Sequence, residues 1–494
     1  MTPGELFAKL WNQIDGQAGA IISVPWPGKQ AREHIRLKAI LSAAETFEVP
    51  QEIEDYLAGG NLDCICDASP DKLDQRAFVV MCALDSVAID IHPSISTRAG
   101  GKAIVLSPLL TRMKQVRTVN GVYGEHGGWR TIPKGRLSKQ RGNPEVDWAS
   151  GANLETQFEY LTVLNAVSAR YSVKIEVVPP RLSPLSGPPK TVGLAPIAED
   201  ADDLAFTPHK RGGRPYLDAR PRDVDLLQTR LINSVTTLLD RGAELIVLPE
   251  LVVPQETADV LATALKARPT PRPEAMIVCG SGLTTMAGDT GLHFNEAVVL
   301  NGYGLELFRQ RKIHPFNMGN HRMRECGIPF ADGCENRPHM EDIEPCTEIM
   351  VRDLTGVGRT MVAICEDLEQ FDPIGDTVMA TRPDWVITPV LDISQKPGRW
   401  THQRSIELGR KTGAQFVVSC SASLTVRMEK AMRLSELSPG QMGLGMLYAG
   451  DSRRVKIVDA SEDVSMPRTL VIDWKPDDWL GDNVTTVPRN RSGS

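Results

Sequence analysis

The C-terminal two thirds of the sequence predict an α/β domain, and the first third predicts a separate folded segment of unassigned class. Prolines and small residues interrupt regular structure between Val178 and Lys190. Beyond that seam, short apolar runs alternate with helical or loop segments, which is typical of α/β folds. We therefore expect an N-terminal domain of unknown fold and function over residues 1–185, an α/β domain over 186–480 and a flexible tail over 481–494.

The apolar runs are short enough to be buried strands. They are TVGLAPI at 191, ELIVLPEL at 244, MIVCGSGL at 276, EAVVLNG at 296, RTMVAIC at 359, DWVITPV at 384, QFVVSCS at 415 and TLVIDW at 469. A helix is expected from Arg222 to Asp240, with Gly242 at its C-cap. In the first third, Glu33 to Phe47 has helical spacing, and Ala77 to Ile91 is either a buried strand or a helix.

Length and composition set broad limits on the kind of protein. A chain of 494 residues is too long for one ordinary core, and 41% hydrophobic with 24% charged residues is globular usage. The start lacks a secretory signal, and no apolar run reaches the roughly 18 residues of a membrane span, so we expect a cytoplasmic protein with no membrane contact. Nine cysteines, an odd number, argue against a disulfide framework.

Three residues with chemical potential follow predicted strands. Glu250 follows ELIVL and Pro249, Lys312 follows LFRQR, and Cys365 ends MVAIC, where the acids Glu366 and Asp367 should raise its pKa. Each has a simpler interpretation by itself, as a surface glutamate, a solvated lysine or a structural cysteine. Together they supply a base, a cation and a nucleophile at strand ends, where α/β folds place their chemistry.

The ordered segments ELIVLPEL, NEAVVLNGYGLELFRQRKIHPF and GRTMVAICEDL resemble the nitrilase superfamily of carbon–nitrogen hydrolases. The family's Glu, Lys and Cys occur in this order, here 62 and 53 residues apart (312 − 250 and 365 − 312). The strand at TVGLAP and the later PDWVITPV, RSIELGRKTGAQFVVSCSAS also match. The resemblance covers residues 191–475, about 285 of the 494.

The resemblance implies a four-layer α-β-β-α sandwich, an amidase-type enzyme and a thioester intermediate. Glu250 would be the general base, Cys365 the nucleophile, and Lys312 with the backbone N–H of Glu366 the oxyanion donors. The substrate would be a small amide, or alternatively a nitrile or carbamoyl compound. No cofactor or metal is implied, and association into a homo-oligomer is expected.

Two features depart from the family pattern. Several members carry a further glutamate between the lysine and the cysteine, and no local pattern selects among four candidates: Glu325, Glu335, Glu341 and Glu344. The segment from Pro208 to Pro221 also lengthens the link after the first strand, and we expect such loops to shape the substrate site. The C-E-D-L at the nucleophile is similar to the glutaminase domains of NAD synthetases, but no Ser-Gly-Gly nucleotide loop follows.

Two groups of cysteine and histidine residues invite a metal interpretation that we do not adopt. The first contains His321, Cys326, Cys334, His339 and Cys346. Its spacing matches no common zinc motif. The second is the pair Cys64 and Cys66, which lacks a second pair, so core thiols are preferred.

The segment 98–141 contains ten Lys or Arg residues against one acid, Glu125, with Tyr123 and Trp129 among them. Such a stretch can follow a nucleic-acid backbone. We prefer a solvated basic face or a surface for an acidic protein. The segment supports an alternative function, a regulatory or nucleic-acid-associated protein in which the nitrilase-like domain oligomerises or senses a ligand.

Overall fold

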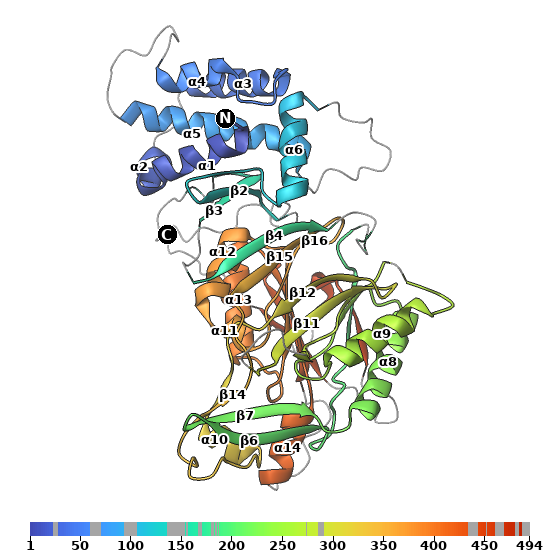
Figure 1. Cartoon of the computed structure of the whole chain (residues 1–494). Coiled ribbons are helices and arrows are strands. Elements are labelled where there is room, and N and C mark those ends of the chain that lie inside the picture. The colour runs from blue at the N-terminus through green and yellow to red at the C-terminus, as the bar shows by residue number, and fades with distance from the viewer. Residues whose placement is uncertain are drawn as a thin grey trace. The chain divides into compact units, whose positions relative to one another are not determined.

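The structure is a computed structural model with two compact units (Figure 1). It describes residues 1–22, 28–59, 71–92, 106–135, 154, 157–165, 170–178, 182, 185, 187–272, 274–284, 291–432, 443–450, 452–459, 469–479 and 484–486. The N-terminal unit comprises residues 1–177 and 376–384, and the C-terminal unit comprises 178–375 and 385–494. The predicted tail, apart from 484–486, and the pair Cys64 and Cys66 lie outside the described residues.

The N-terminal unit is mainly helical. Its helices are α1 (Pro3–Ile14), α2 (Ala18–Ile22), α3 (Gly28–Ala43), α4 (Gln51–Ala58), α5 (Asp71–Ala88), α6 (Pro108–Asn120) and α12 (Asp376–Thr381). A small sheet of order β1-β2-β3 joins β1 (Gly124–His126), β2 (Trp129–Pro133) and β3 (Leu161–Leu164), and β4 (Ser172–Val178) reaches the unit boundary. Helix α5 contacts α1, α3 and α4, and this burial on several sides hides the helical period in the sequence from Ala77 to Ile91.

Two large sheets form the centre of the C-terminal unit. The first has the order β10-β11-β9-β8-β5-β21, with β12 paired to β11, and the second contains β22-β20-β19-β18-β17-β16-β15. The strands of the first sheet are β5 (Thr191–Leu194), β8 (Leu245–Val247), β9 (Met276–Val278), β10 (Gly282–Thr284), β11 (Phe294–Asn301), β12 (Glu306–Arg311) and β21 (Leu470–Asp473). Those of the second are β15 (Glu348–Leu354), β16 (Gly358–Val362), β17 (Trp385–Val390), β18 (Gln415–Cys420), β19 (Gly443–Ala449), β20 (Arg454–Asp459) and β22 (Val484–Thr486).

Helices cover the outer face of each large sheet, which completes the four layers expected from the sequence. Helices α8 (Val224–Asp240) and α9 (Gln255–Lys266) lie on one side, and α11 (Glu366–Glu369) and α13 (Trp400–Thr412) lie on the other (Figure 1). Leu231 of α8 belongs to the same buried cluster as Ile246 and Ile277, which alternate with residues buried on the inner face. Each predicted apolar run overlaps a strand. The helix predicted from Arg222 to Asp240 is α8, which begins at Val224 after the N-cap Asp223 and ends at Asp240.

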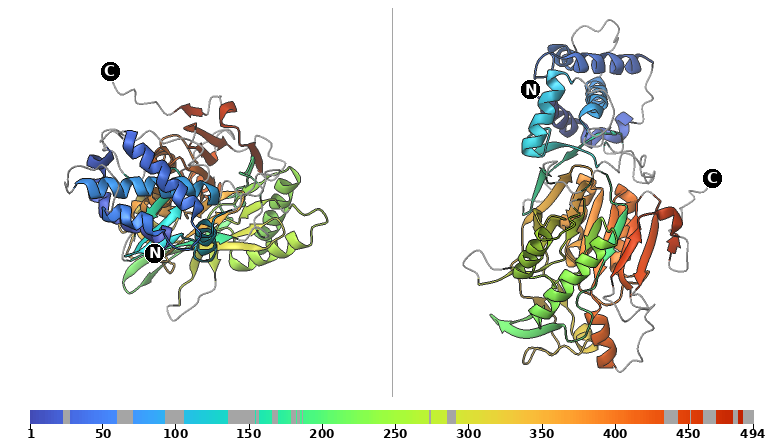
Figure 2. Two further views of the ribbon diagram at one scale, coloured as in Figure 1. Left: turned by 90° about the horizontal axis from the view of Figure 1, so that it is seen from above. Right: turned by 90° about the vertical axis from the view of Figure 1, so that its right-hand side faces the viewer.

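A third sheet has the order β13-β14-β7-β6. It contains β6 (Leu204–Arg211), β7 (Arg214–Pro221), β13 (Asn317–Met318) and β14 (His339–Glu341). In Figure 1, β6, β7 and β14 lie beside α10 (Asn320–Glu325) and α14 (Ser423–Met432), and the right-hand view of Figure 2 shows the same grouping at the lower end of the C-terminal unit. The expectation of a loop from Pro208 to Pro221 is therefore wrong, because this segment forms most of the antiparallel β6–β7 hairpin. Gly212 and Gly213 both have positive φ, 56° and 75°, and this is the conformation that closes a tight hairpin.

No described helix is long and apolar enough to cross a membrane.

Gly280 fixes the approach of two strand ends in the C-terminal unit, and its replacement should be costly. Its φ is +65°, and a Cβ would lie 1.9 Å from the carbonyl oxygen of Pro249, next to Glu250. Gly280→Ala should therefore lower the free energy of unfolding by about 3 kcal/mol or more. Gly242→Ala is the matched control, because its φ is +83° with nothing within 4 Å, so only the backbone strain of roughly 1–2 kcal/mol applies. Equal losses in urea denaturation would contradict this account.

Candidate active site

The structure brings Glu250, Lys312 and Cys365 into one buried cluster in the C-terminal unit. Glu250 follows β8 and Lys312 directly follows β12, both in the first large sheet, whereas Cys365 follows β16 in the second. Glu250 and Lys312 are 0% exposed and Cys365 is 7% exposed. Residues far apart in sequence are therefore collected where strands of two facing sheets end.

Lys312 lies between two carboxylates. Its Nζ donates to Oε1 of Glu250 at 2.7 Å and to Oε2 of Glu341 at 2.6 Å. Glu341 is 3% exposed and ends β14. Of the four glutamates left open by the sequence, the structure therefore places Glu341 against the lysine. No local signal identified it, because its position depends on the parallel pairing of β14 with β7.

Asn295 is a further member of the cluster that the sequence did not single out. Its Nδ2 donates to Oε1 of Glu250 and to Oε1 of Glu341, both at 3.0 Å, and its side chain is fully buried. It is the second residue of β11, within the quoted segment NEAVVLNG. Asn295 lies on β11 and Lys312 follows β12, its antiparallel neighbour, so both side chains reach the carboxylates of Glu250 and Glu341 from adjacent strands.

Backbone amides complete the coordination of the two glutamates. Leu391 N–H donates to Oε2 of Glu250 at 3.0 Å, and Phe316 N–H donates to Oε2 of Glu341 at 3.0 Å. The thiol of Cys365 lies near the carboxylate of Glu250 and opposes the rise in the pKa of Glu250 that burial causes. The side chains of Lys312 and Asn295 therefore hold Oε1 of Glu250, and the backbone N–H of Leu391, which follows β17, holds Oε2.

Cys365 occupies a strained turn between strand and helix. Its φ of 49° and ψ of −109° are rare for a residue other than glycine, and such strain costs on the order of 1–3 kcal/mol. Its N–H donates to the carbonyl of Pro389 at 2.9 Å, which ties the turn to β17. Glu366, whose N–H is the expected oxyanion donor, opens α11 immediately after it. The turn lifts the thiol out of the β16 ladder.

The charges of the cluster determine its protonation. Burial raises the pKa of the Cys365 thiol well above its ordinary value, the negative charge of Glu250 adds to this, and Lys312 opposes it. Burial likewise raises the pKa of Glu250, against the influence of Lys312. Burial alone would lower the pKa of Lys312, but Glu250 and Glu341 outweigh it and raise that pKa well above normal. At neutral pH the thiol is therefore protonated and the lysine is a cation.

The acids beside Cys365 act differently from the sequence expectation. Burial and Glu250 are the largest causes of the raised pKa of the thiol, rather than Glu366 and Asp367. The carboxylate of Asp367 accepts backbone N–H groups of Ile313 and His314, and that of Glu366 accepts from Gln370. Neighbours in sequence are thus not the electrostatic neighbours of the thiol.

The other cysteines that the structure describes lie in different surroundings. Burial raises the pKa of Cys279 and that of Cys420 to about 12. Within the described ranges, no group of three His, Cys, Asp or Glu side chains is arranged to hold a metal ion. His339 instead accepts the N–H of Ala331 at 3.0 Å through Nε2.

The described part of the basic segment 98–141 spans residues 106–135. Within it, Lys134 is buried and its Nζ donates to the carbonyl of Phe158, and Arg117 is also buried. These two cations are therefore unavailable to a phosphate backbone. Arg136, Lys139 and Arg141 lie outside the described residues.

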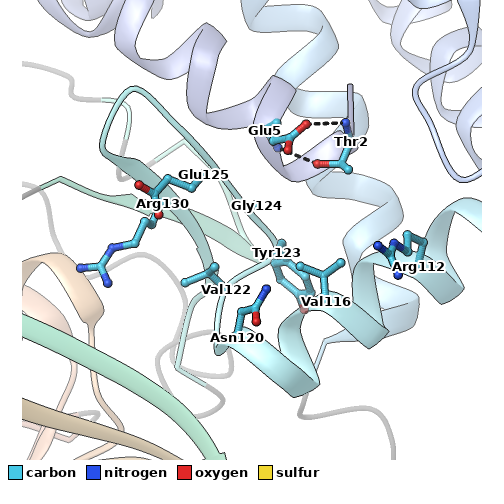
Figure 3. A pocket seen from close by; sticks show the side chains of 10 residues that line it. All are labelled: Thr2, Glu5, Arg112, Val116, Asn120, Val122, Tyr123, Gly124, Glu125 and Arg130. Atoms are coloured by element: carbon cyan, nitrogen blue, oxygen red, sulfur yellow. Dashed lines mark hydrogen bonds between the residues drawn. The ribbon is translucent and has the colours of Figure 1, made fainter.

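A pocket of about 470 Å³ lies in the N-terminal unit (Figure 3). It is lined by Thr2, Glu5, Arg112, Val116, Asn120, Val122, Tyr123, Gly124, Glu125 and Arg130. Several of its polar groups are already engaged. Thr2 and Glu5 hydrogen-bond to each other in the capping box of α1, and Arg130 donates to the carbonyl of Val173 at 2.9 Å. The pocket offers no cysteine, serine or histidine in its described lining.

No protein-family model and no curated protein matches the sequence. Three similar structures are Nit3 of Saccharomyces cerevisiae, a glutamine-dependent NAD+ synthetase of Acinetobacter baumannii and an amidase of Nesterenkonia. Nit3 and the Nesterenkonia amidase are described as nitrilase superfamily proteins.

The likeness to nitrilase superfamily structures is distant. Nit3 is 13% identical with a TM-score of 0.36, over 59% of this chain and 92% of that one. The synthetase is 13% identical at 0.38, over 61% of this chain and 48% of that one, and the amidase is 17% identical at 0.34, over 61% and 93%. A likeness at these scores carries no conclusion about the reaction, for which the buried cluster provides the argument.

Removing the charge of Glu250 should lower the pKa of Cys365. Burial raises that pKa most, and the negative charge of Glu250 is the next cause because it disfavours the thiolate. Glu250→Gln removes this negative charge, while Lys312 stays cationic beside Glu341 and continues to favour the thiolate. Alkylation of Cys365 by iodoacetamide, followed against pH by peptide mass spectrometry, should reach its midpoint at lower pH than in wild type. Glu325→Gln on α10 is the control and should leave the midpoint unchanged. A higher midpoint for Glu250→Gln would refute the assigned electrostatics.

Proposed function

We propose that the C-terminal unit hydrolyses the C–N bond of a small amide through a thioester on Cys365. The observation that supports this most is the buried group of Lys312, Glu250 and Glu341 beside a cysteine in a strained turn. Charges are rarely buried without a compensating role, and perturbed ionisable groups concentrate at functional sites. The arrangement supplies a nucleophile, a base and a cation within one cluster.

In the first half of the reaction, Glu250 accepts the proton of the Cys365 thiol as sulfur attacks the amide carbon. The S–C bond forms and the carbonyl π pair moves to oxygen, whose negative charge is stabilised by Lys312 and the N–H of Glu366. Collapse of this intermediate breaks the C–N bond. Glu250 returns its proton to the departing amine, and the acyl group remains on sulfur as a thioester.

In the second half, water replaces the amine. Glu250 removes a proton from the water as its oxygen attacks the thioester carbon, and the same oxyanion donors stabilise the second intermediate. The C–S bond then breaks, the proton passes from Glu250 to the thiolate, and the carboxylic acid leaves. Because Glu250 alternates between acceptor and donor, a pKa raised by burial suits both of its roles.

Glu341 and Asn295 support this chemistry without taking a proton in the scheme. Glu341 adds a second negative charge beside Lys312 and helps to keep the amine protonated. Asn295 donates to Oε1 of both glutamates and so holds their carboxylates in fixed orientation. A nitrile or carbamoyl substrate would use the same residues, but an amide needs the fewest additional groups.

Serine in place of Cys365 should remove turnover, because a hydroxyl is a far poorer nucleophile than a thiol when Glu250 is the base. Release of ammonia or amine from a panel of small amides, ureas and nitriles measures this. Cys365→Ser should lose at least about 10³-fold in kcat for each accepted substrate. Cys82→Ser, in the N-terminal unit, is the control and should retain full activity. Retained activity in Cys365→Ser would exclude the proposed mechanism.

Removal of Lys312 should slow the reaction and destabilise the fold together. Lys312→Ala removes an oxyanion donor, which costs on the order of 10²–10³ in kcat, and leaves Glu250 and Glu341 without their shared cation. Adding Glu341→Gln removes one unpaired carboxylate, so the double variant should regain part of the lost Tm without regaining rate. If the double variant is less stable than Lys312→Ala, the electrostatic role of Glu341 is wrong.

A further inference from the structure

Asp367 is a buried carboxylate beside the nucleophile that the proposed reaction does not use. It is the second residue of α11, and its side chain is fully buried. Its Oδ1 accepts the N–H of Ile313 at 3.1 Å and that of His314 at 2.8 Å. Its Oδ2 accepts the N–H of Ile364 at 3.3 Å and is also 3.3 Å from the N of Ile313.

These backbone donors belong to two separate segments. Ile313 and His314 follow Lys312 directly at the end of β12, and Ile364 directly precedes Cys365 at the end of β16. The side chain of Asp367 therefore joins the two residues that follow Lys312 to the residue that precedes Cys365. The imidazole Nδ1 of His314 also lies 3.3 Å from Oδ1.

The two strands that carry Lys312 and Cys365 do not share a hydrogen-bond ladder. β12 pairs with β11 in the first large sheet, and β16 pairs with β15 and β17 in the second. Sheet register therefore does not set the position of Lys312 relative to Cys365, which depends on contacts between the two sheets. Asp367 makes one such contact: it lies two residues after Cys365, and two of its backbone donors, Ile313 and His314, directly follow Lys312.

We propose that Asp367 is a positioning residue that holds the Lys312 segment against the Cys365 turn. This inference rests on the proposed function for its effect on turnover, although its effect on the thiol can be measured without a substrate. Hydrogen bonds from buried amides to a carboxylate are charge-assisted and stronger than neutral ones. A displacement of about 1 Å at a catalytic group can cost on the order of 10² in rate.

An amide cannot replace the carboxylate in this place. In Asp367→Asn one oxygen remains as acceptor, and the NH₂ group meets a backbone N–H that also donates. If the oxygen faces Ile313 and His314, the contact with Ile364 is lost. If it faces Ile364, the contact with His314 and the shorter contact with Ile313 are lost, and only the 3.3 Å contact with Ile313 remains on the Lys312 segment. The variant keeps the volume of the side chain and weakens the link between the two segments.

Asp203 provides a matched control in the same unit. Its Oδ2 accepts the N–H groups of Glu199 and Asp200 at 2.8 and 2.9 Å, and Arg230 donates to it at 2.7 Å. It is 9% exposed, and the backbone donors lie within four residues of it. Asp203→Asn therefore removes a buried carboxylate with backbone partners but disturbs only a local turn.

The experiment compares wild type, Asp367→Asn and Asp203→Asn in the full chain. The readouts are the rate of Cys365 alkylation by iodoacetamide at fixed pH, Tm, and kcat and KM for an amide found to be hydrolysed. We expect Asp367→Asn to lower alkylation and kcat by about tenfold or more, with KM within about twofold. Asp203→Asn should lower Tm with alkylation and kcat unchanged.

Three outcomes would overturn the inference. Asp367→Asn could lower Tm alone, or Asp203→Asn could slow alkylation equally. If Asp367→Asn does not fold, hydrogen exchange of the wild type decides: the amides of Ile313, His314 and Ile364 should be protected together, and rapid exchange at Ile313 and His314 alone refutes the bridge. Slower alkylation in Asp367→Asn without turnover of any amide by wild type would uphold the inference and reject the proposed function.

Discussion

The buried ammonium group of Lys312, held between Glu250 and Glu341, is the interaction on which the rest of the site depends. Moving a charge from water into a protein interior costs several kcal/mol, and leaving one partner of a buried pair alone costs about 3–5 kcal/mol. Here three charged groups are buried, and each carboxylate has a backbone N–H as an additional donor, from Leu391 or Phe316. Such a cluster persists only if the surrounding strands hold all of its members at once.

This requirement explains why the site draws on three sheets. The first large sheet supplies Glu250, Asn295 and Lys312, and the second supplies Cys365. The third sheet, which contains the β6–β7 hairpin, supplies Glu341. No single ladder could place these groups, because neighbouring positions on one strand face opposite sides. The facing sheets give the site its shape, and the carboxylates of the cluster fix the lysine between them. In the proposed reaction the same electrostatics keep the thiol protonated until Glu250 accepts its proton.

Much of the fold was predictable because burial leaves a pattern in the residues. The apolar runs became strands, and Leu231 with its neighbours at helical spacing became α8. The pattern of apolar and polar residues did not distinguish helix from strand between Ala77 and Ile91. This segment is helical, but it is buried on several sides, so it has no polar face that would reveal the helical period. The hairpin that turns at Gly212 and Gly213 has a local signal in the glycine pair, but the prolines and charged residues on both sides hide the strands that it joins.

The positions of Glu250, Lys312 and Cys365 after strands could be predicted from the sequence because each follows a recognisable strand pattern, whereas the residues around them could not be predicted. Glu341 and Asn295 reach Lys312 through strand pairings that join distant segments. Asp367 is adjacent to the Cys365 turn in sequence, which predicts an electrostatic effect on the thiol, but in the structure its carboxylate accepts backbone N–H groups. Side-chain direction at a turn is set by tertiary contacts, and local residue type does not reveal it.

Rapid-quench mass spectrometry of the full chain during turnover of a small amide tests whether Cys365 carries the acyl group. We expect a transient adduct on the peptide that contains Cys365, equal in mass to the acyl group, formed as one equivalent of amine is released. The adduct should disappear as the carboxylic acid forms. Turnover without any adduct on Cys365, or with a kinetically competent adduct on another residue, would contradict the account.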